Sequence, residues 1–166
     1  MLTYLDGNQL IDQNAIHENL LNNSVGPFPA DLGKNINYGI YDKSTVSLIK
    51  GKTYTISCKS NGNLFGKAFD ATANTSSFSV YFYTPDHSNY FQVLGNSKGN
   101  SLTFTMKNFS GIWVLCMQYN GNPTNDGNKF PKVEQVKVEQ GNKATSWLPS
   151  SQDLADVISK MVTGEK

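Results

Sequence analysis

The chain contains no arginine: all 14 of its basic side chains are lysines, and 13 acidic side chains leave a formal net charge of +1 over 166 residues. The chain therefore lacks the planar guanidinium group of arginine, which forms paired hydrogen bonds with phosphates and base edges, and it has no surplus of positive charge to neutralise a phosphate backbone. We therefore expect no nucleic-acid partner. A coding bias toward A/T-rich codons explains the missing arginine and the many asparagines equally well.

Charged residues make up only 16% of the chain, below the roughly 25% of an average globular protein. Asn, Ser, Thr, Gly and Tyr take their place, which predicts a polar but largely neutral surface. No apolar run approaches the roughly 20 residues of a membrane span, and no signal peptide is recognisable, so we expect a product made in the cytoplasm without membrane insertion. The length and the 38% apolar content suit one domain with one core.

The cysteines and histidines do not form a reactive cluster. Cys58 and Cys116 each lie in an apolar, strand-like run rather than in a CxxC or Cys/His pattern, which predicts buried free thiols and no metal framework. His17 and His87 have no neighbouring serine, cysteine or carboxylate that suggests a proton relay, and His87 is interpreted as an exposed loop residue. The chain also lacks phosphate-binding loops and zinc-protease motifs, so we expect no enzyme activity and no cofactor.

The acidic residues do not suggest a glycosidase or an ion site. Glycoside hydrolysis needs two carboxylates that face each other, but Glu134 and Glu139 lie an odd number of positions apart on one strand and are predicted to face opposite sides. Loop acids such as Asp70, Asp86 and Asp126 lack the spacing of a calcium-binding loop and are interpreted as solvated turn residues.

Between residues 44 and 148, short β-prone segments alternate with Gly, Asn, Asp and Pro clusters, which is typical of an all-β, antiparallel sandwich. The expected strands are residues 52–60, 77–84, 101–106, 111–119 and 132–139. Alternation in the first of these turns Tyr54, Ile56 and Cys58 inward. The segment 111–119 is apolar at both parities, which predicts a central strand covered on both faces.

A second face of the sandwich is predicted to be aromatic. In the segment 77–84, alternation turns Val80 and Phe82 inward and leaves tyrosines on the opposite face. Sugar rings stack on aromatic side chains through their apolar C–H faces, and their hydroxyls pair with neutral polar groups. The candidate saccharide-binding residues are Tyr81, Tyr83, Tyr90 and Tyr119. The alternative interpretation is that these tyrosines are ordinary strand formers; Trp113 is expected in the core.

The two ends differ from the middle. Residues 1–18 are expected to form an arm or a short hairpin. In residues 150–166, Ser150 and Asp153 form a capping pattern that predicts a helix with one apolar stripe. The stripe consists of Leu154, Val157, Ile158 and Met161. The stability of so short a helix on its own is marginal, so another surface is expected to cover the stripe. We expect sister chains or a linked segment to do so in preference to the sandwich of the same chain, and hence a homo-oligomer.

Three segments resemble parts of the jelly-roll, carbohydrate-binding modules found in phage tail and baseplate proteins. Residues 132–149, KVEQVKVEQGNKATSWLP, resemble the closing segment of such modules; residues 50–57, KGKTYTIS, resemble an opening strand; and residues 19–24, NLLNNS, resemble the strand that leads into it. The resemblance implies a jelly roll over residues 19–149 and a place in the virion tail. Some such modules hold a structural calcium, whose ligands this sequence does not identify.

Within the closing segment, Gly141 is expected to turn the chain. Trp147 and Pro149 are expected to staple the last strand across the sandwich edge, and Trp147 is not counted as a binding residue.

The sequence therefore favours a non-catalytic phage tail or baseplate module that binds host cell-wall polysaccharide of a Gram-positive bacterium. The alternative is a structural adaptor of the baseplate that mediates oligomerisation or attaches the receptor-binding protein. In both cases other tail and baseplate proteins are expected partners. A glycan hydrolase is the least favoured interpretation.

Overall fold

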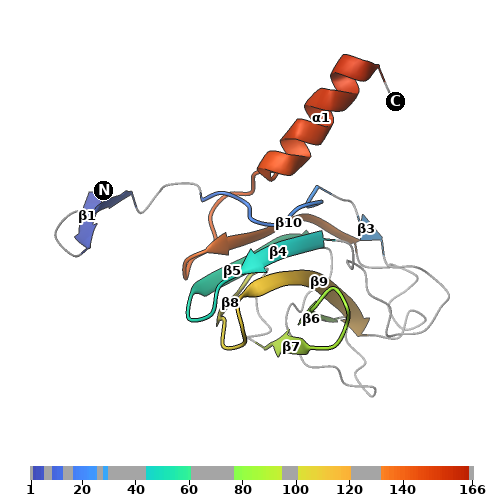
Figure 1. The fold of residues 1–166 in the computed structure, drawn as a ribbon. Helices are drawn as coiled ribbons and strands as arrows, with labels where there is room; N and C mark the ends of the chain where they lie inside the picture. Colours follow the sequence, from blue (N-terminus) through green and yellow to red (C-terminus); the bar gives the residue numbers. More distant parts are fainter. Residues whose placement is uncertain are drawn as a thin grey trace.

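The computed structural model (Figure 1) describes the backbone of residues 2–5, 9–12, 17–25, 28–29, 44–60, 77–94, 101–120 and 132–164. Side chains are described for residues 17–25, 44–59, 79–94, 101–117 and 134–164. Ten strands and one helix lie in these ranges. The predicted all-β antiparallel architecture with a short C-terminal helix is confirmed at this level.

The strands pair into one two-stranded and two four-stranded sheets. They are β1 (Leu2–Leu5), β2 (Gln9–Asp12), β3 (Phe28–Pro29), β4 (Ser44–Leu48), β5 (Thr53–Ser60), β6 (Ser77–Tyr83), β7 (Tyr90–Val93), β8 (Ser101–Thr105), β9 (Gly111–Asn120) and β10 (Lys132–Gln140). β1 and β2 form an antiparallel hairpin within the predicted N-terminal arm. Sheet I has the order β3-β10-β5-β8, and sheet II has the order β4-β9-β6-β7.

All neighbouring strands of the two larger sheets are antiparallel, and their pairing is nested. β3 pairs with β10, β4 with β9, β5 with β8, and β6 with β7. Segments far apart in the chain therefore lie side by side: β3, the first strand of the sandwich, forms one edge of sheet I and pairs with β10, the last (Figure 1).

The core lies between the inner faces of the two sheets. Tyr54, Ile56 and Cys58 of β5 are buried as predicted, and burial raises the pKa of the Cys58 thiol to about 12. Both cysteines are buried and free, again as predicted. Trp113 is fully buried, so its assignment to the core is confirmed. Phe82 contributes a ring stacked at 5.2 Å on Phe91.

The central strand β9 is buried on both faces near Cys116, which lies on the outer face and is buried, but not at its start. The prediction of a strand covered on both faces is therefore wrong at that end. Trp113, Leu115 and Met117 are buried, whereas Ile112 is 59% exposed. Ile112 pairs with Ser47 of β4, which is itself exposed. An apolar residue at both parities indicated burial on both sides, but at this end of β9 the outer face of sheet II is open.

A β-bulge in β10 reverses the predicted orientation of one glutamate. The register with β5 shifts between Glu134 and Lys137, and Gln135 adopts a φ of 54°. Because the bulge inserts an extra residue, Glu134 and Glu139 pair with β5 residues of the same parity and lie on the same outer face of sheet I. Their predicted opposite orientation is wrong, since the parity argument assumed an unbroken ladder.

Residues 19–24 are not a strand, contrary to the resemblance. The amide of Leu20 donates to Val138 O at 2.8 Å in sheet I, and the amide of Asn22 donates to Thr45 O at 3.2 Å in sheet II. The Asn19 side chain accepts from the amides of Leu21 and Val138, both at 3.1 Å. This side chain replaces regular ladder bonds, so the segment crosses between the two sheets instead of extending one of them.

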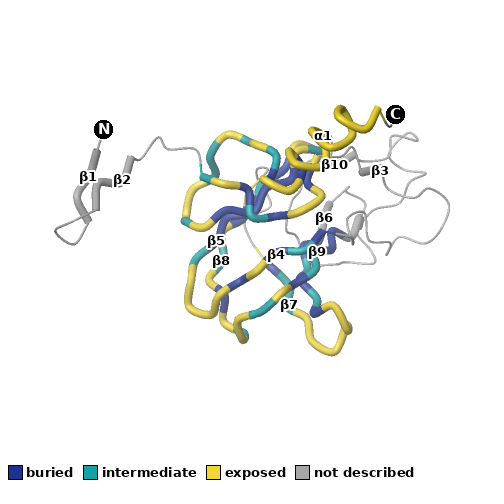
Figure 2. Tube along the Cα trace, turned by 45° about the horizontal axis from the view of Figure 1, so that its top comes forward, coloured by how far each residue is buried: buried dark blue, intermediate teal, exposed yellow. Residues whose placement is uncertain are grey.

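The helix α1 (Ser151–Thr163) begins at the predicted capping box and leaves the sandwich (Figure 1). Its apolar stripe is uncovered: Val157 is 52% exposed and Ile158 59%, and Figure 2 shows the helix exposed along its length. Within the described residues, the stripe is not docked on the sandwich of its own chain. No helix in the described ranges is long and apolar enough to traverse a membrane.

The first turn of α1 is fastened to the sandwich by Asp153, which is buried. Its carboxylate accepts hydrogen bonds from the amide and hydroxyl of Ser24 at 3.1 and 2.5 Å, and from the amide and hydroxyl of Ser150 at 3.2 and 2.9 Å. Burial acts to raise the pKa of Asp153, but the hydrogen bonds from Ser24 and Ser150 outweigh it and lower the pKa below its usual value.

We expect Asp153→Asn to lower the free energy of unfolding by about 1–3 kcal/mol at neutral pH, because hydrogen bonds to a charged acceptor are lost. A carboxyl whose pKa is depressed by folding stabilises the fold above its unfolded pKa of about 3.9 and loses that contribution as the pH falls through the folded pKa. Urea unfolding at pH 7 and pH 3 checks this. The variant should lose less stability on acidification than the native chain; equal losses would contradict the assignment.

Candidate functional site

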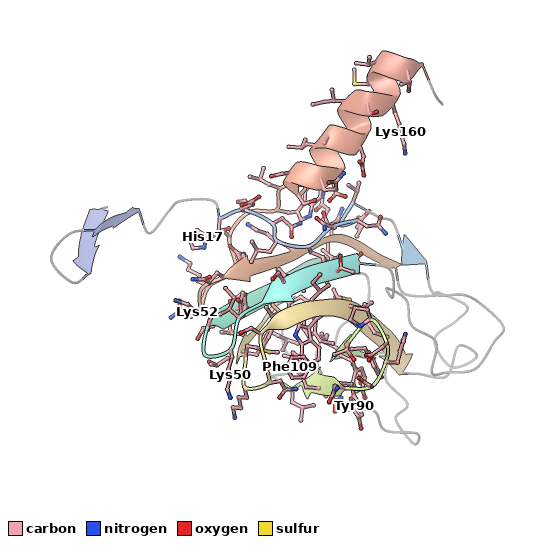
Figure 3. All side chains as sticks on the ribbon, in the orientation of Figure 1. His17, Lys50, Lys52, Tyr90, Phe109 and Lys160 are labelled. Carbon is pink, nitrogen blue, oxygen red and sulfur yellow. The ribbon has the colours of Figure 1, made fainter. Side chains whose placement is uncertain are left out.

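Three of the four predicted binding residues form one row on the outer face of sheet II. In this tyrosine row, Tyr81 and Tyr83 of β6 are partly exposed, and Tyr90 of β7 is 64% exposed. The antiparallel register places Tyr83 directly opposite Tyr90. Figure 3 shows Tyr90 at the end of the sandwich away from α1.

The rings of the tyrosine row contact one another. Tyr83 and Tyr90 are stacked, with centroids 5.5 Å apart and planes at 24°. Tyr81 lies 6.1 Å from Tyr83 and 6.5 Å from Tyr90. These separations fall in the range of favourable aromatic pairs, so each ring restrains its neighbours before any ligand arrives. The result is a continuous aromatic surface with hydroxyls attached.

The turn between β6 and β7 is held by its own side chains. The Asp86 carboxylate accepts from the amide and hydroxyl of Ser88 at 3.1 and 2.9 Å. Hydrogen bonds from Thr84 and from Ser88 lower the pKa of Asp86 to about 2. These bonds explain Asp86 as a turn residue, as predicted. The turn also places the exposed His87 ring 5.6 Å from Tyr83, next to the row.

Tyr83, in the middle of the tyrosine row, is uncharged at neutral pH. Burial, followed by the proximity of Cys116, Tyr81 and Tyr90, raises the pKa of Tyr83 above its usual value. The phenol therefore stays protonated and is able both to donate and to accept a hydrogen bond. Neutral polar groups on an aromatic surface are the chemistry that pyranose rings require.

Other predicted positions are not in the row or lie outside the described part. Tyr119 pairs with Phe78 in the β6–β9 register, and its side chain is outside the described residues. Asp70 and Asp126 also lie outside them. Within the ranges described, no group of three or more His, Cys, Asp or Glu residues is placed to hold a metal ion.

The outer face of sheet I carries a buried polar network that sequence reasoning missed. Lys137 and Glu139 are fully buried, with 3.3 Å between their charged atoms. Thr145 bridges them: its hydroxyl lies 2.6 Å from Lys137 Nζ and donates to Glu139 Oε2 at 2.6 Å, and its amide donates to Glu139 Oε1 at 2.8 Å. Lys137 also donates to Ser146 O at 2.9 Å. The network fixes the closing segment across the sheet.

Two more residues of the closing segment have defined structural roles. Gly141 adopts a φ of 131°, a conformation that favours glycine, and it turns the chain as predicted. The indole of Trp147 donates to Val136 O at 3.1 Å, which fixes it over β10 as the stapling prediction requires. His17, labelled in Figure 3, adds a contact at 3.5 Å between its Nδ1 and Glu139 Oε2.

A shallow depression of about 260 Å³ lies where the closing segment crosses sheet I. It is lined by Ser57, Cys58, Lys59, Ser101, Gln135, Ala144, Thr145 and Trp147. No sequence pattern indicates this depression, because its lining comes from β5, β8, β10 and the closing segment, and its position depends on the bulge at Gln135.

Comparison of the chain with protein-family models, with curated proteins and with solved structures finds no match.

Proposed function

We propose that the chain is a non-catalytic module of a phage tail or baseplate that binds host cell-wall saccharide through the tyrosine row. The observation that carries the proposal is the mutually packed set of solvent-accessible rings at Tyr81, Tyr83 and Tyr90. A set of aromatic side chains held in place before binding loses little conformational entropy when a sugar stacks on it.

We also propose that the sandwich is a jelly roll. The nested pairing of β3 with β10, β4 with β9, β5 with β8 and β6 with β7 supports this, because rolling one long hairpin around a barrel-like core produces that order. This topology agrees with the resemblance of residues 132–149 and 50–57 to phage tail and baseplate modules.

Each site is expected to bind weakly, since a shallow aromatic face makes few directional bonds. A virion that carries several copies reaches a higher overall affinity through avidity, because the second and later binding events are intramolecular. The useful probe is therefore a multimeric form of the chain.

The test is retention of the multimerised chain on purified cell walls of Gram-positive bacteria and on a glycan array. Tyr83→Ala combined with Tyr90→Ala should reduce retention at least about tenfold, because two stacked rings are removed from an exposed face and about 1.4 kcal/mol suffices for that factor. Lys52→Ala, at an exposed lysine outside the tyrosine row and outside the lining of the sheet I depression, is the matched control and should bind like the native chain. A blank array with the native multimer, or unchanged binding by the double variant, would contradict the proposal.

A second function is supported by the uncovered stripe on α1. In this alternative, the chain is a baseplate adaptor that oligomerises through α1 or attaches a receptor-binding protein, with other tail proteins as partners. Deleting residues 150–166 and replacing the tyrosines separates the two functions. Loss of oligomers on deletion, together with unchanged cell-wall binding of the tyrosine variants, favours the adaptor.

A further inference from the structure

We propose that the depression on the outer face of sheet I is a second binding site, one that accepts a single neutral saccharide unit beside Trp147. This groove lies on the sheet opposite the tyrosine row, so it does not depend on that row binding anything. Its volume of about 260 Å³ is just below the range of typical small-ligand pockets, which suits one ring better than an extended chain.

The floor of the groove presents hydroxyls from two paired strands. Ser57 of β5 lies directly opposite Ser101 of β8 in the register, so their side chains point to the same outer face. Along β5 the next outward residue is Lys59. The hydroxyls of Ser57 and Ser101 offer neutral donors and acceptors, which is what sugar hydroxyls need.

The bulge in β10 forms one side of the groove. Gln135 is exposed and lines the depression, and it has a φ of 54° although it is not glycine. Such a conformation is strained for a residue with a side chain, and bulges commonly re-aim a side chain. A glutamine amide at this position supplies one donor and one acceptor to a bound sugar.

The wall of the groove is held rigidly. Thr145 is fixed by the buried Lys137 and Glu139, and Trp147 is fixed by its bond to Val136 O. Trp147 remains partly exposed and lines the depression. The Trp147 indole is therefore held in place before a ligand binds, and the serine hydroxyls and the Gln135 amide lie in the same groove. This arrangement is a preorganised surface for the apolar face of a sugar ring.

The charges around the groove are compensated, which indicates a neutral ligand. Lys59 is paired with Glu134 at 2.8 Å on the rim, and Lys137 is paired with Glu139 beneath the wall. A phosphate or carboxylate ligand would have to compete with these glutamates for the lysines.

The experiment is an NMR titration of the full chain with a panel of neutral monosaccharides, namely glucose, galactose, rhamnose and N-acetylglucosamine, and with inorganic phosphate. The chain has only two tryptophans, so its indole N–H region contains two signals, and the fully buried Trp113 is an internal control. At least one sugar should shift the Trp147 signal saturably while the Trp113 signal stays in place. No saturable shift with any sugar, or a response to phosphate alone, would overturn the proposal.

Two variants that leave the stapling indole intact sharpen this test. Gln135→Gly removes the amide but suits the positive φ, so it should fold at least as stably and raise the dissociation constant about fivefold, the equivalent of one neutral hydrogen bond. Ser101→Trp should fill the groove and abolish the shift. Unchanged titrations in both variants would refute the site.

Tyr83→Ala with Tyr90→Ala should leave the Trp147 response intact, which separates failure of this site from failure of the tyrosine row.

Discussion

Replacing either member of the buried pair Lys137 and Glu139 is expected to lower the free energy of unfolding by about 3–5 kcal/mol, because the remaining charge is left buried without its partner. Lys137→Met leaves the Glu139 carboxylate buried without its ion-pair partner, and Glu139→Leu does the same to the Lys137 ammonium group. Urea denaturation of each variant at neutral pH measures the effect. This loss is a large share of the stability of a typical domain.

The double variant Lys137→Met with Glu139→Leu should be more stable than either single variant. Removing both charges together also removes the desolvation cost of the pair, and apolar replacement of a buried ion pair is often neutral. A double variant whose loss equals the sum of the single losses would contradict this account, since it would mean that the two residues act independently.

The exposed pair Lys59 and Glu134 is the matched control. Its atoms are closer, at 2.8 Å compared with 3.3 Å, but both side chains reach solvent. Lys59→Met should change the free energy of unfolding by less than about 0.5 kcal/mol, because exposed ion pairs contribute little. Burial rather than distance should therefore decide the outcome.

Ile158→Asp is expected to convert an oligomer into a monomer and to reduce apparent affinity for intact cell walls by about 10²–10⁴-fold, the range over which avidity is lost when sites are unlinked. Ile158 lies in the middle of the uncovered stripe, where a partner helix would bury it. A carboxylate in that contact loses its hydration without gaining a partner. Light scattering gives the molar mass, and sedimentation with cell walls gives the affinity.

Ser159→Asp adds the same charge to the next residue of α1, outside the apolar stripe, and should leave both mass and affinity unchanged. A native chain that is already monomeric, or an Ile158→Asp variant that retains its oligomeric mass, would show that the stripe does not join copies of this chain.

The parts of the fold predictable from the sequence were those set by local periodicity and capping. Alternation fixed the buried face of β5, and the Ser150 and Asp153 pattern located the start of α1. The same parity placed Tyr81 and Tyr83 on one outer face. Tyr90 joins them through β7, a strand that was not predicted and that pairs with β6 across the turn at residues 84–89.

The parts that were not predictable depend on exceptions to periodicity or on distant contacts. Nothing about Gln135 indicates that a glutamine will adopt a positive φ, yet the bulge there turns Glu134 and Glu139 to one face. Burial of Lys137 requires Thr145 to cross the sheet, which is a tertiary contact. Likewise, apolar residues at both parities of β9 could not reveal that Ile112 would remain exposed.

The most direct test of the central claim compares Tyr90→Phe with Tyr90→Ala in equilibrium binding to solubilised cell-wall polysaccharide. Phenylalanine keeps the ring that stacks on Tyr83, so its dissociation constant should stay within about threefold of the native value, whereas alanine should weaken binding about tenfold. If the alanine variant binds as tightly as the native chain, this surface does not hold saccharide by ring stacking.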